Sequence, residues 1–237
     1  LHLLYARFWH KVLFDCGYAT TPEPFMKLRN QGLITSRSYR IPGGNYVEEH
    51  EIVEKDGKYF HKETKTELLS QVEKMSKSKM NGVTPDNVVD DFGADSLRLY
   101  EMFMGPLEKE KVWNTDAVNG CRRFLSRLHD MAYSDKVCDE DTEEALRLGH
   151  RLVHAVTNDI ENLSFNTAIA KMMEFVNDFV KLPKYPKTVL KMLVLSLAPF
   201  APHMAEELWE HLGGTESVVF EPFPEVDPKY LQEAVVT

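Results

Sequence analysis

The sequence lacks the features that define membrane, secreted and disulfide-bonded proteins. No apolar run approaches the roughly 20 residues that a membrane-spanning helix needs, and the first residues lack the basic-then-apolar order of a signal peptide. The 3 cysteines, Cys16, Cys121 and Cys138, form no C-x-x-C pair. This argues against a cysteine-rich zinc site and a disulfide framework. We expect a cytoplasmic protein with reduced thiols, no membrane contact and no protein-bound metal.

The sequence also lacks an excess of positive charge. Its formal net charge is -9 over 237 residues, so it has no general basic field for nucleic acid. Local basic patches can still contact a phosphate backbone, and they lie at Arg122, Arg123 and Arg127 and at Lys181, Lys184, Lys187 and Lys191. The hydrophobic share of 43% and the charged share of 27% indicate a folded chain of one large or two ordinary domains.

The first half of the chain mixes helix and strand signals. Apolar spacing predicts a helix over residues 1–16 that ends at Gly17. Thr21 followed by Pro22 predicts a second helix, which ends near Gly32. The dipeptide Asp56-Gly57 predicts the turn of a β-hairpin within residues 51–61. The other elements predicted here are a strand at 33–36, a turn at 42–45 and helices at 84–93 and 95–104.

Beyond residue 115 the pattern predicts amphipathic helices with no strand between them. A helix with one apolar face must bury that face against others, so residues 115–214 are predicted to form a helix bundle. We interpret residues 1–114 as an α/β domain and residues 215–237 as an irregular linker. The predicted bundle helices are about 116–133, one opened by the capping box Asp141-x-x-Glu144, one through Ile169 and Phe179, one through Val189 and Leu197, and a last one that stops at Gly213.

A lysine-rich segment between the predicted β-hairpin region and the predicted helix at 84–93 carries the chemistry. Charge alone predicts only a solvated loop at Lys74, Lys77 and Lys79. The full word Lys74-Met75-Ser76-Lys77-Ser78 is far more specific, because it arises by chance in such a chain with a probability on the order of one in ten thousand. This word resembles the signature loop of class I aminoacyl-tRNA synthetases.

Other segments narrow the resemblance to the leucyl members of that class. The stretches that resemble them are residues 74–85, Phe92 to Tyr100, Leu1 to Trp9, Phe165 to Ile169, Pro199 to His203 and Glu206 to Trp209. The resemblance covers nearly the whole chain. It implies the second half of a Rossmann-like nucleotide fold with an inserted β-hairpin, followed by a bundle of the type that binds the tRNA anticodon arm.

The resemblance also implies substrates, a reaction and site residues. The leucine carboxylate attacks the α-phosphate of ATP, which binds with Mg²⁺, and the leucyl group then passes to tRNA(Leu). Ammonium groups that meet the departing pyrophosphate lower the barrier, and Lys77, followed by Lys74, is the candidate for this catalytic role. The remaining assignments are Met75 near adenine, Ser76 and Ser78 at phosphate, His2 at the leucine pocket, and Lys79, Arg123 and Arg127 at tRNA.

Several alternatives remain open at this point. Arg123 and Arg127 also suit a solvated helix flank, and His2 suits a packed core position. Trp113, Trp209 and Asn166 are predicted to pack or cap rather than bind a ligand. The chain can also belong to a valyl or isoleucyl enzyme, or to a non-catalytic RNA-binding or scaffold module.

The sequence departs from the class I pattern in one respect. It has no His-x-Gly-His stretch, and the nearest string, Arg147-Leu148-Gly149-His150, lies in a predicted bundle helix. We therefore expect a truncated chain, without the amino-terminal catalytic half, the editing domain and the C-terminal domain. Such a chain is expected to be inactive in leucyl-adenylate formation.

Overall fold

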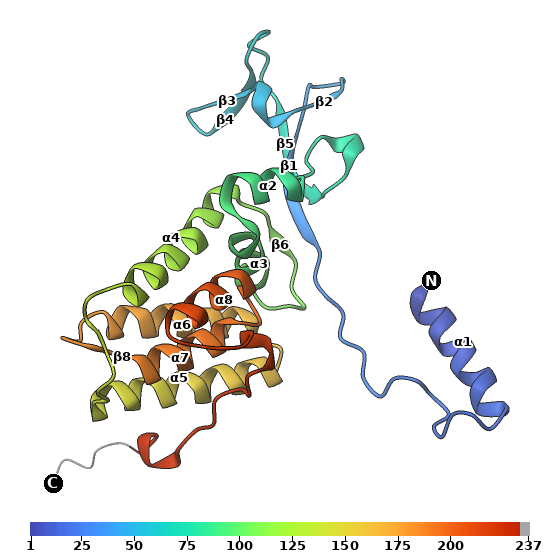
Figure 1. Cartoon of the computed structure of the whole chain (residues 1–237). Helices are drawn as coiled ribbons and strands as arrows, with labels where there is room; N and C mark the ends of the chain where they lie inside the picture. The colour runs from blue at the N-terminus through green and yellow to red at the C-terminus, as the bar shows by residue number, and fades with distance from the viewer. Residues whose placement is uncertain (233–237) are drawn as a thin grey trace. The chain divides into compact units, whose positions relative to one another are not determined.

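The computed structural model describes residues 1–232, and it divides the chain into two compact units, Leu1–Gln31 and Gly32–Thr237 (Figure 1). No helix in the described part of the chain is long and apolar enough to cross a membrane. Cys16, Cys121 and Cys138 are free thiols, as predicted.

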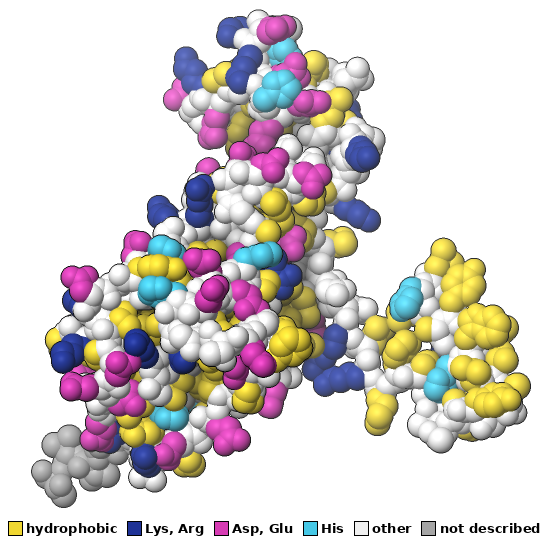
Figure 2. Space-filling model, viewed as in Figure 1, with side chains coloured by type: hydrophobic (Ala, Val, Ile, Leu, Met, Phe, Trp, Pro, Cys, Tyr) yellow, Lys and Arg dark blue, Asp and Glu magenta, His cyan; other side chains and the backbone are white. Residues whose placement is uncertain are grey.

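The first unit contains the predicted opening helix, α1 (His2–Asp15). Gly17 ends it with a φ of 79°, a conformation that glycine adopts readily. No residue of α1 is buried. Leu4 is 71% exposed, and Phe8 and Trp9 are each 61% exposed, so the helix presents an apolar surface (Figure 2).

The prediction of a second helix in this unit is wrong. Residues 16–33 contain no helix. The side chains near its predicted start contact α1 instead: Glu23 accepts hydrogen bonds from Arg7 at 2.8 Å and pairs with Lys11 at 2.9 Å, and His10 Nε2 donates to the Thr21 carbonyl at 2.7 Å. Pro24 also disfavours a helical backbone at Glu23, inside the first turn that was predicted.

A small sheet opens the second unit. Strand β1 (Ile34–Arg40) pairs antiparallel with β2 (Tyr46–Val47) and β5 (Leu69–Lys74), and parallel with β6 (Lys111–Val112). This confirms the predicted strand near residue 34 and the turn after residue 41, whereas β2, β5 and β6 were not predicted. Only one pair of strands in this sheet is parallel, so the Rossmann-like half remains a prediction.

The predicted hairpin is confirmed. Strands β3 (Ile52–Lys55) and β4 (Lys58–His61) pair antiparallel after a short 3-10 turn, η1 (Glu49–Glu51). Asp56 and Gly57 between them have φ values of 54° and 73°, which are typical of the tight turn that this dipeptide favours.

Two helices before the bundle and five helices of the bundle complete the described part of the unit. Helices α2 (Pro85–Phe92) and α3 (Ala94–Phe103) confirm the predicted pair. The bundle helices are α4 (Thr115–Ala132), α5 (Glu143–Glu161), α6 (Phe165–Phe179), α7 (Lys187–Leu197) and α8 (Pro202–His211). The short elements are β7 (Val137–Cys138) and β8 (Tyr185–Pro186), which pair with each other, and the turns η3 (Val218–Phe220) and η4 (Pro228–Tyr230).

Two details of the predicted bundle are wrong. The short paired strands β7 and β8 lie between its helices, where no strand was predicted. The Thr142 hydroxyl, not Asp141, caps α5, because Thr142 is the extended residue before the helix and its Oγ1 accepts from Ala145 N at 3.3 Å. The stretch Arg147 to His150 lies inside α5, as predicted. A side chain at Gly149 would press on Val189 and Met192 at 3.0 Å, so this glycine permits the close approach of α5 and α7.

One hydrophobic core joins the helices of the second unit. Val88 of α2 and Leu99 and Tyr100 of α3 belong to the same buried cluster as the bundle helices. The predicted domain boundary at residue 114 therefore remains a prediction. Further members of the cluster are Val118, Leu128, Val156, Ile169, Met172, Phe179, Leu193 and Leu208.

Candidate functional site

The lysine-rich word forms a compact loop between β5 and α2. Lys74 is the last residue of β5 and lies opposite Thr35 of β1. Ser76 is extended and leads into a 3-10 turn, η2 (Lys77–Lys79), in which Lys79 N donates to Ser76 O at 3.1 Å. Met80 then turns the chain with a φ of 52°. Residues 76–80 therefore form one tight turn rather than an extended lysine-rich strand.

The buried amide of Asn81 closes the base of this loop. Asn81 is 6% exposed. Its Oδ1 accepts from Ser76 N at 2.9 Å, and its Nδ2 donates to Ser36 O at 3.2 Å and to Glu73 O at 3.5 Å. The side chain thus ties the loop both to its own entry and to β1.

Glu73 forms a second contact at the base. Its carboxylate accepts from Lys79 Nζ, from Ser38 Oγ at 2.5 Å and from the Tyr46 hydroxyl at 3.4 Å. The hydrogen bond from Lys79 and then that from Ser38 lower the pKa of Glu73, and the hydrogen bond to Glu73 raises the pKa of Lys79. Lys79 therefore has an internal partner, and its predicted contact with tRNA remains a prediction.

The other two lysines of the loop are in a different state. Lys74 and Lys77 are exposed, and neither ammonium group forms a hydrogen bond or an ion pair with any residue from 1 to 232. The hydroxyls of Ser76 and Ser78 lie 3.2 Å apart. The loop thus presents two unpaired cations and two hydroxyl groups, which is the donor set that a polyphosphate requires.

Lys77 lines an open groove between the small sheet, the hairpin and the start of α4. Arg37 and Tyr59 line it on one side, with the Arg37 guanidinium 5.5 Å from the centre of the Tyr59 ring. Trp113 and Asn114 line it on another side. Trp113 packs edge-on against Tyr100 at 5.0 Å and donates to Thr115 Oγ1 at 3.0 Å, which fits its predicted packing role.

The predicted tRNA-binding arginines lie on α4. Arg123 and Arg127 are exposed, and neither has a partner among the described residues. Their neighbour Arg122 instead donates to Asp91 O at 2.8 Å and ties α4 to the end of α2. Arg123 and Arg127 are therefore available to phosphate, whereas Arg122 already uses one of its donors within the chain.

His2 lies on α1, in the separate unit Leu1–Gln31, where it is exposed. Its predicted place at the leucine pocket remains a prediction. Among residues 1–232 no three His, Cys, Asp or Glu side chains are grouped so that they hold a metal ion.

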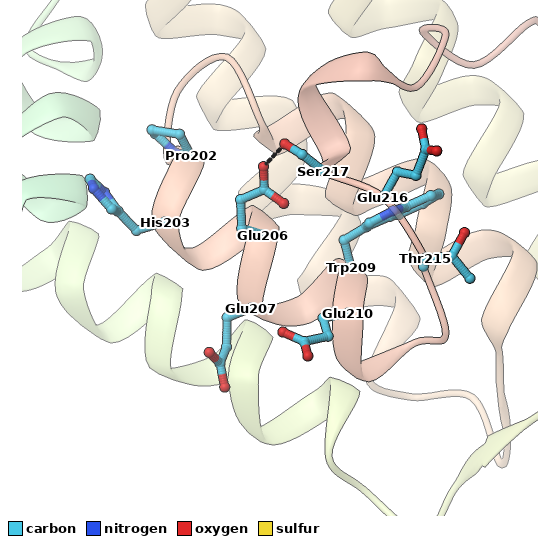
Figure 3. A pocket seen from close by; sticks show the side chains of 10 residues that line it. Pro202, His203, Glu206, Glu207, Trp209, Glu210, Thr215, Glu216 and Ser217 are labelled. Atoms are coloured by element: carbon cyan, nitrogen blue, oxygen red, sulfur yellow. Dashed lines mark hydrogen bonds between the residues drawn. The ribbon is translucent and has the colours of Figure 1, made fainter.

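Glutamates make up four of the ten residues that line a pocket beside α8. Figure 3 shows Glu206 turned toward Ser217, with which it forms a hydrogen bond, and Trp209 close to the segment 214–216. Glu206 also accepts from Val218 N at 3.0 Å. The Trp209 Nε1 group is buried and has no partner within the described chain, and a side chain at Gly214 would collide with it. The hydrogen bonds to Glu206 hold residues 217 and 218 against α8.

Comparisons with known proteins agree with this arrangement. Residues 67–113 match the family model described as tRNA synthetases class I (I, L, M and V), and residues 143–236 match the anticodon-binding domain of tRNA ligase. The first match contains the loop, and the second covers most of the bundle. The chain belongs to the class I aminoacyl-tRNA synthetases.

The individual relatives found are leucyl members of this class. The chain is 64% identical over its whole length to the leucine–tRNA ligase of Protochlamydia amoebophila and 52% identical to that of Chlamydia muridarum. It also resembles a chain in the crystal structure of the ternary complex of the Agrobacterium radiobacter K84 agnB2 LeuRS with tRNA and LeuAMS, with a TM-score of 0.70, 30% identity and 98% of this chain covered. The chain is therefore similar over its whole length to a segment of leucyl-tRNA synthetases, and it spans 28% to 29% of the length of these relatives.

Proposed function

We propose that this chain supplies a leucine–tRNA ligase with its mobile phosphate-binding loop and with most of its tRNA-arm bundle. The observation that carries the proposal is the contrast among the loop lysines. Glu73 engages Lys79, whereas Lys74 and Lys77 extend from an anchored loop with no partner among the described residues. The chain spans 28% of the length of the Protochlamydia amoebophila relative, and in this proposal the other half of the ATP site lies in the remainder of such an enzyme.

The unpaired lysines suit the chemistry of amino-acid activation. When the leucine carboxylate attacks the α-phosphate of ATP, negative charge grows on the departing pyrophosphate, which leaves with Mg²⁺. A cation that meets this charge stabilises the transition state more than the bound substrate. In this proposal Lys77 takes that role, Lys74 assists, and the Ser76 and Ser78 hydroxyls donate to phosphate oxygens. His2 borders the leucine pocket, and Met75 lies near adenine.

The bundle suits the second substrate, tRNA(Leu). Arg123 and Arg127 lie four residues apart on α4, so they share one flank of the helix. Guanidinium groups bind phosphate oxygens well, and such contacts fix the register of a bound nucleic acid. The Agrobacterium relative was crystallised in a ternary complex that contains tRNA, which supports a tRNA-facing role for this fold.

The proposal is tested in a full-length enzyme. The matching segment of the Protochlamydia amoebophila ligase is replaced by residues 1–237 to give a chimaeric enzyme. Leucine-dependent exchange between ATP and pyrophosphate is then measured. We expect Lys77→Ala to lower kcat between about tenfold and about 150-fold, because one charge-assisted contact contributes about 1.5 to 3 kcal/mol.

Lys171→Ala is the matched control, because this lysine pairs with Glu174 on the surface of α6, remote in sequence from the loop. It should exchange at the rate of the unmodified chimaera. If Lys77→Ala exchanges at that rate as well, the loop has no catalytic role and the chain acts only as a non-catalytic RNA-binding module.

A further inference from the structure

We propose that Asn81 is a positioning residue for amino-acid activation, because its buried amide fixes the path of the loop that carries Lys77. This inference rests on the proposed function. Asn81 does not belong to the five-residue word, it is 6% exposed, and both ends of its amide form hydrogen bonds with the backbone. Its effect would be exerted through the loop backbone.

The place of the two carbonyl acceptors supports this role. Ser36 and Glu73 are directly paired residues on β1 and β5, and Asn81 Nδ2 donates to both of their carbonyl oxygens. The amide therefore spans the last part of the β1–β5 ladder before the loop leaves the sheet. The loop's downstream end is thereby tied to the sheet from which its upstream end emerges.

The acceptor half of the same amide reaches into the loop. Asn81 Oδ1 accepts from Ser76 N at 2.9 Å, and Ser76 is the residue that precedes η2. A carboxamide offers both donors and an acceptor on one short side chain, and aspartate, serine and alanine at this position lose at least one of these contacts. If Ser76 moved away from Asn81, the buried Asn81 Oδ1 would lose its hydrogen bond from Ser76 N, and an unpaired buried polar group costs free energy.

Two contacts hold the chain on either side of Lys77, and we call them braces. Asn81 holds Ser76 before it, and the ion pair with Glu73 holds Lys79 after it. The backbone of Lys77 therefore lies between two residues that are held in place, Ser76 and Lys79. The Lys77 side chain itself is unpaired among the described residues. A displacement of a catalytic group by about 1 Å can cost about 100-fold in rate. Loss of the Asn81 brace is therefore expected to slow the reaction.

The test compares Asn81→Ala and Asn81→Asp in the chimaeric enzyme. Aspartate keeps the size of the side chain and the acceptor for Ser76 N but loses both donors, so it separates loss of the brace from loss of packing. We expect both variants to lower kcat of ATP–pyrophosphate exchange on the order of 10-fold to 100-fold, with the KM for leucine changed less than about threefold. Asn177→Ala, an exposed asparagine on α6, is the control and should match the unmodified enzyme.

A double variant separates positioning from general destabilisation. If Asn81 acts through Lys77, then Asn81→Ala combined with Lys77→Ala should lose little more than Lys77→Ala alone. If the two substitutions instead lowered kcat by independent factors that multiply in the double variant, the inference would be overturned. A kcat of Asn81→Ala equal to that of the control would overturn it as well. If Lys77→Ala itself proves harmless, the proposed function fails first, and this result is distinct from a failure of the brace alone.

Proteolysis gives a readout that does not depend on catalysis. Without the brace the bond after Lys77 should open to trypsin more often, and cleavage there should accelerate on the order of tenfold while other sites in the chain keep their rates. Equal cleavage after Lys77 in Asn81→Ala and in the unmodified enzyme would contradict the inference.

Discussion

At the residue scale, the Glu73 carboxylate separates the roles of the three lysines in the loop. It binds Lys79 and is 15% exposed, whereas Lys79 is 31% exposed. The Ser38 hydroxyl and the Tyr46 hydroxyl donate to the same carboxylate. Because Glu73 already has these partners, Lys74 and Lys77 are left for an external anion.

His150 gives a prediction at the same scale. It is 8% exposed, stacks on Tyr230 at 4.7 Å, and its Nδ1 accepts from Asp227 N at 3.3 Å. An accepting Nδ1 is unprotonated, so this contact needs the neutral ring. Burial lowers the pKa of His150, the Asp227 carboxylate opposes that shift, and Lys229 adds to it.

The sign of the pH effect follows. The unfolded chain binds a proton on His150 at higher pH than the folded chain does, so stability should fall as the pH drops below about 6.5. Urea unfolding of the purified chain at about pH 7.5 and about pH 5.5 measures this loss. We expect the loss to be smaller in His150→Gln than in the unmodified chain. An equal loss in both would show that this histidine does not contribute.

At the element scale, Asp95 of α3 caps a helix that lies far away in the sequence. Its carboxylate accepts from Met204 N at 2.7 Å and lies 2.8 Å from His203 Nδ1, while Arg98 donates to Pro199 O at 3.0 Å and to Phe200 O at 3.2 Å. The residue before α8 has no capping side chain of its own. Helix α3 therefore satisfies backbone groups on both sides of the α7–α8 junction.

Removal of this cap should loosen α8. Asp95→Ala is expected to cost about 1 to 2 kcal/mol in local stability, so hydrogen exchange at Met204 N should accelerate roughly 5-fold to 30-fold. Asp95→Asn keeps an oxygen acceptor and should change the exchange rate much less. The measurement is hydrogen exchange across 202–211 in the purified chain. An unchanged rate in Asp95→Ala would refute the role of this cap.

Periodicity was sufficient to predict the bundle helices that bury an apolar face, from α4 to α8. The Thr84-Pro85 start signal predicted α2, and the Asp56-Gly57 turn predicted the hairpin. The similar start signal at Thr21-Pro22 failed, because Phe25 and Met26 remain exposed and no helix forms. The sequence patterns also missed β5, whose strand pairing depends on β1 rather than on its own largely polar sequence. Local patterns cannot report partners that are distant in the chain.

The same reason explains what was missed in the candidate site. The motif itself identified Lys74 and Lys77, but Asn81 and Glu73 went unnoticed although they lie close on either side of it. Asn81 acts on Ser36, which is 45 residues away, and Glu73 on Ser38, which is 35 residues away. Only the folded arrangement shows that one of the three loop lysines is engaged.

At the scale of the whole molecule, the proposed function assigns different substrates to the bundle and to the loop. Arg123→Ala and Arg127→Ala in the chimaeric enzyme should each weaken tRNA(Leu) binding and reduce the slope of log affinity against log salt by about 1. Arg151→Ala, an exposed arginine on α5, is the matched control. Filter binding at several salt concentrations measures the effect. Unchanged slopes would show that the two α4 arginines are a solvated flank.

The shared core has a mechanical consequence for the two halves of this unit. Val88 of α2 and Leu208 of α8 lie in one buried cluster, and close-packed interiors transmit displacement rather than absorb it. Helix α2 begins only four residues after Asn81. If the bundle tilted when a nucleic acid bound, the shared core would therefore move α2 and, with it, the downstream end of the lysine loop. The side chains that transmit this movement would contact neither substrate.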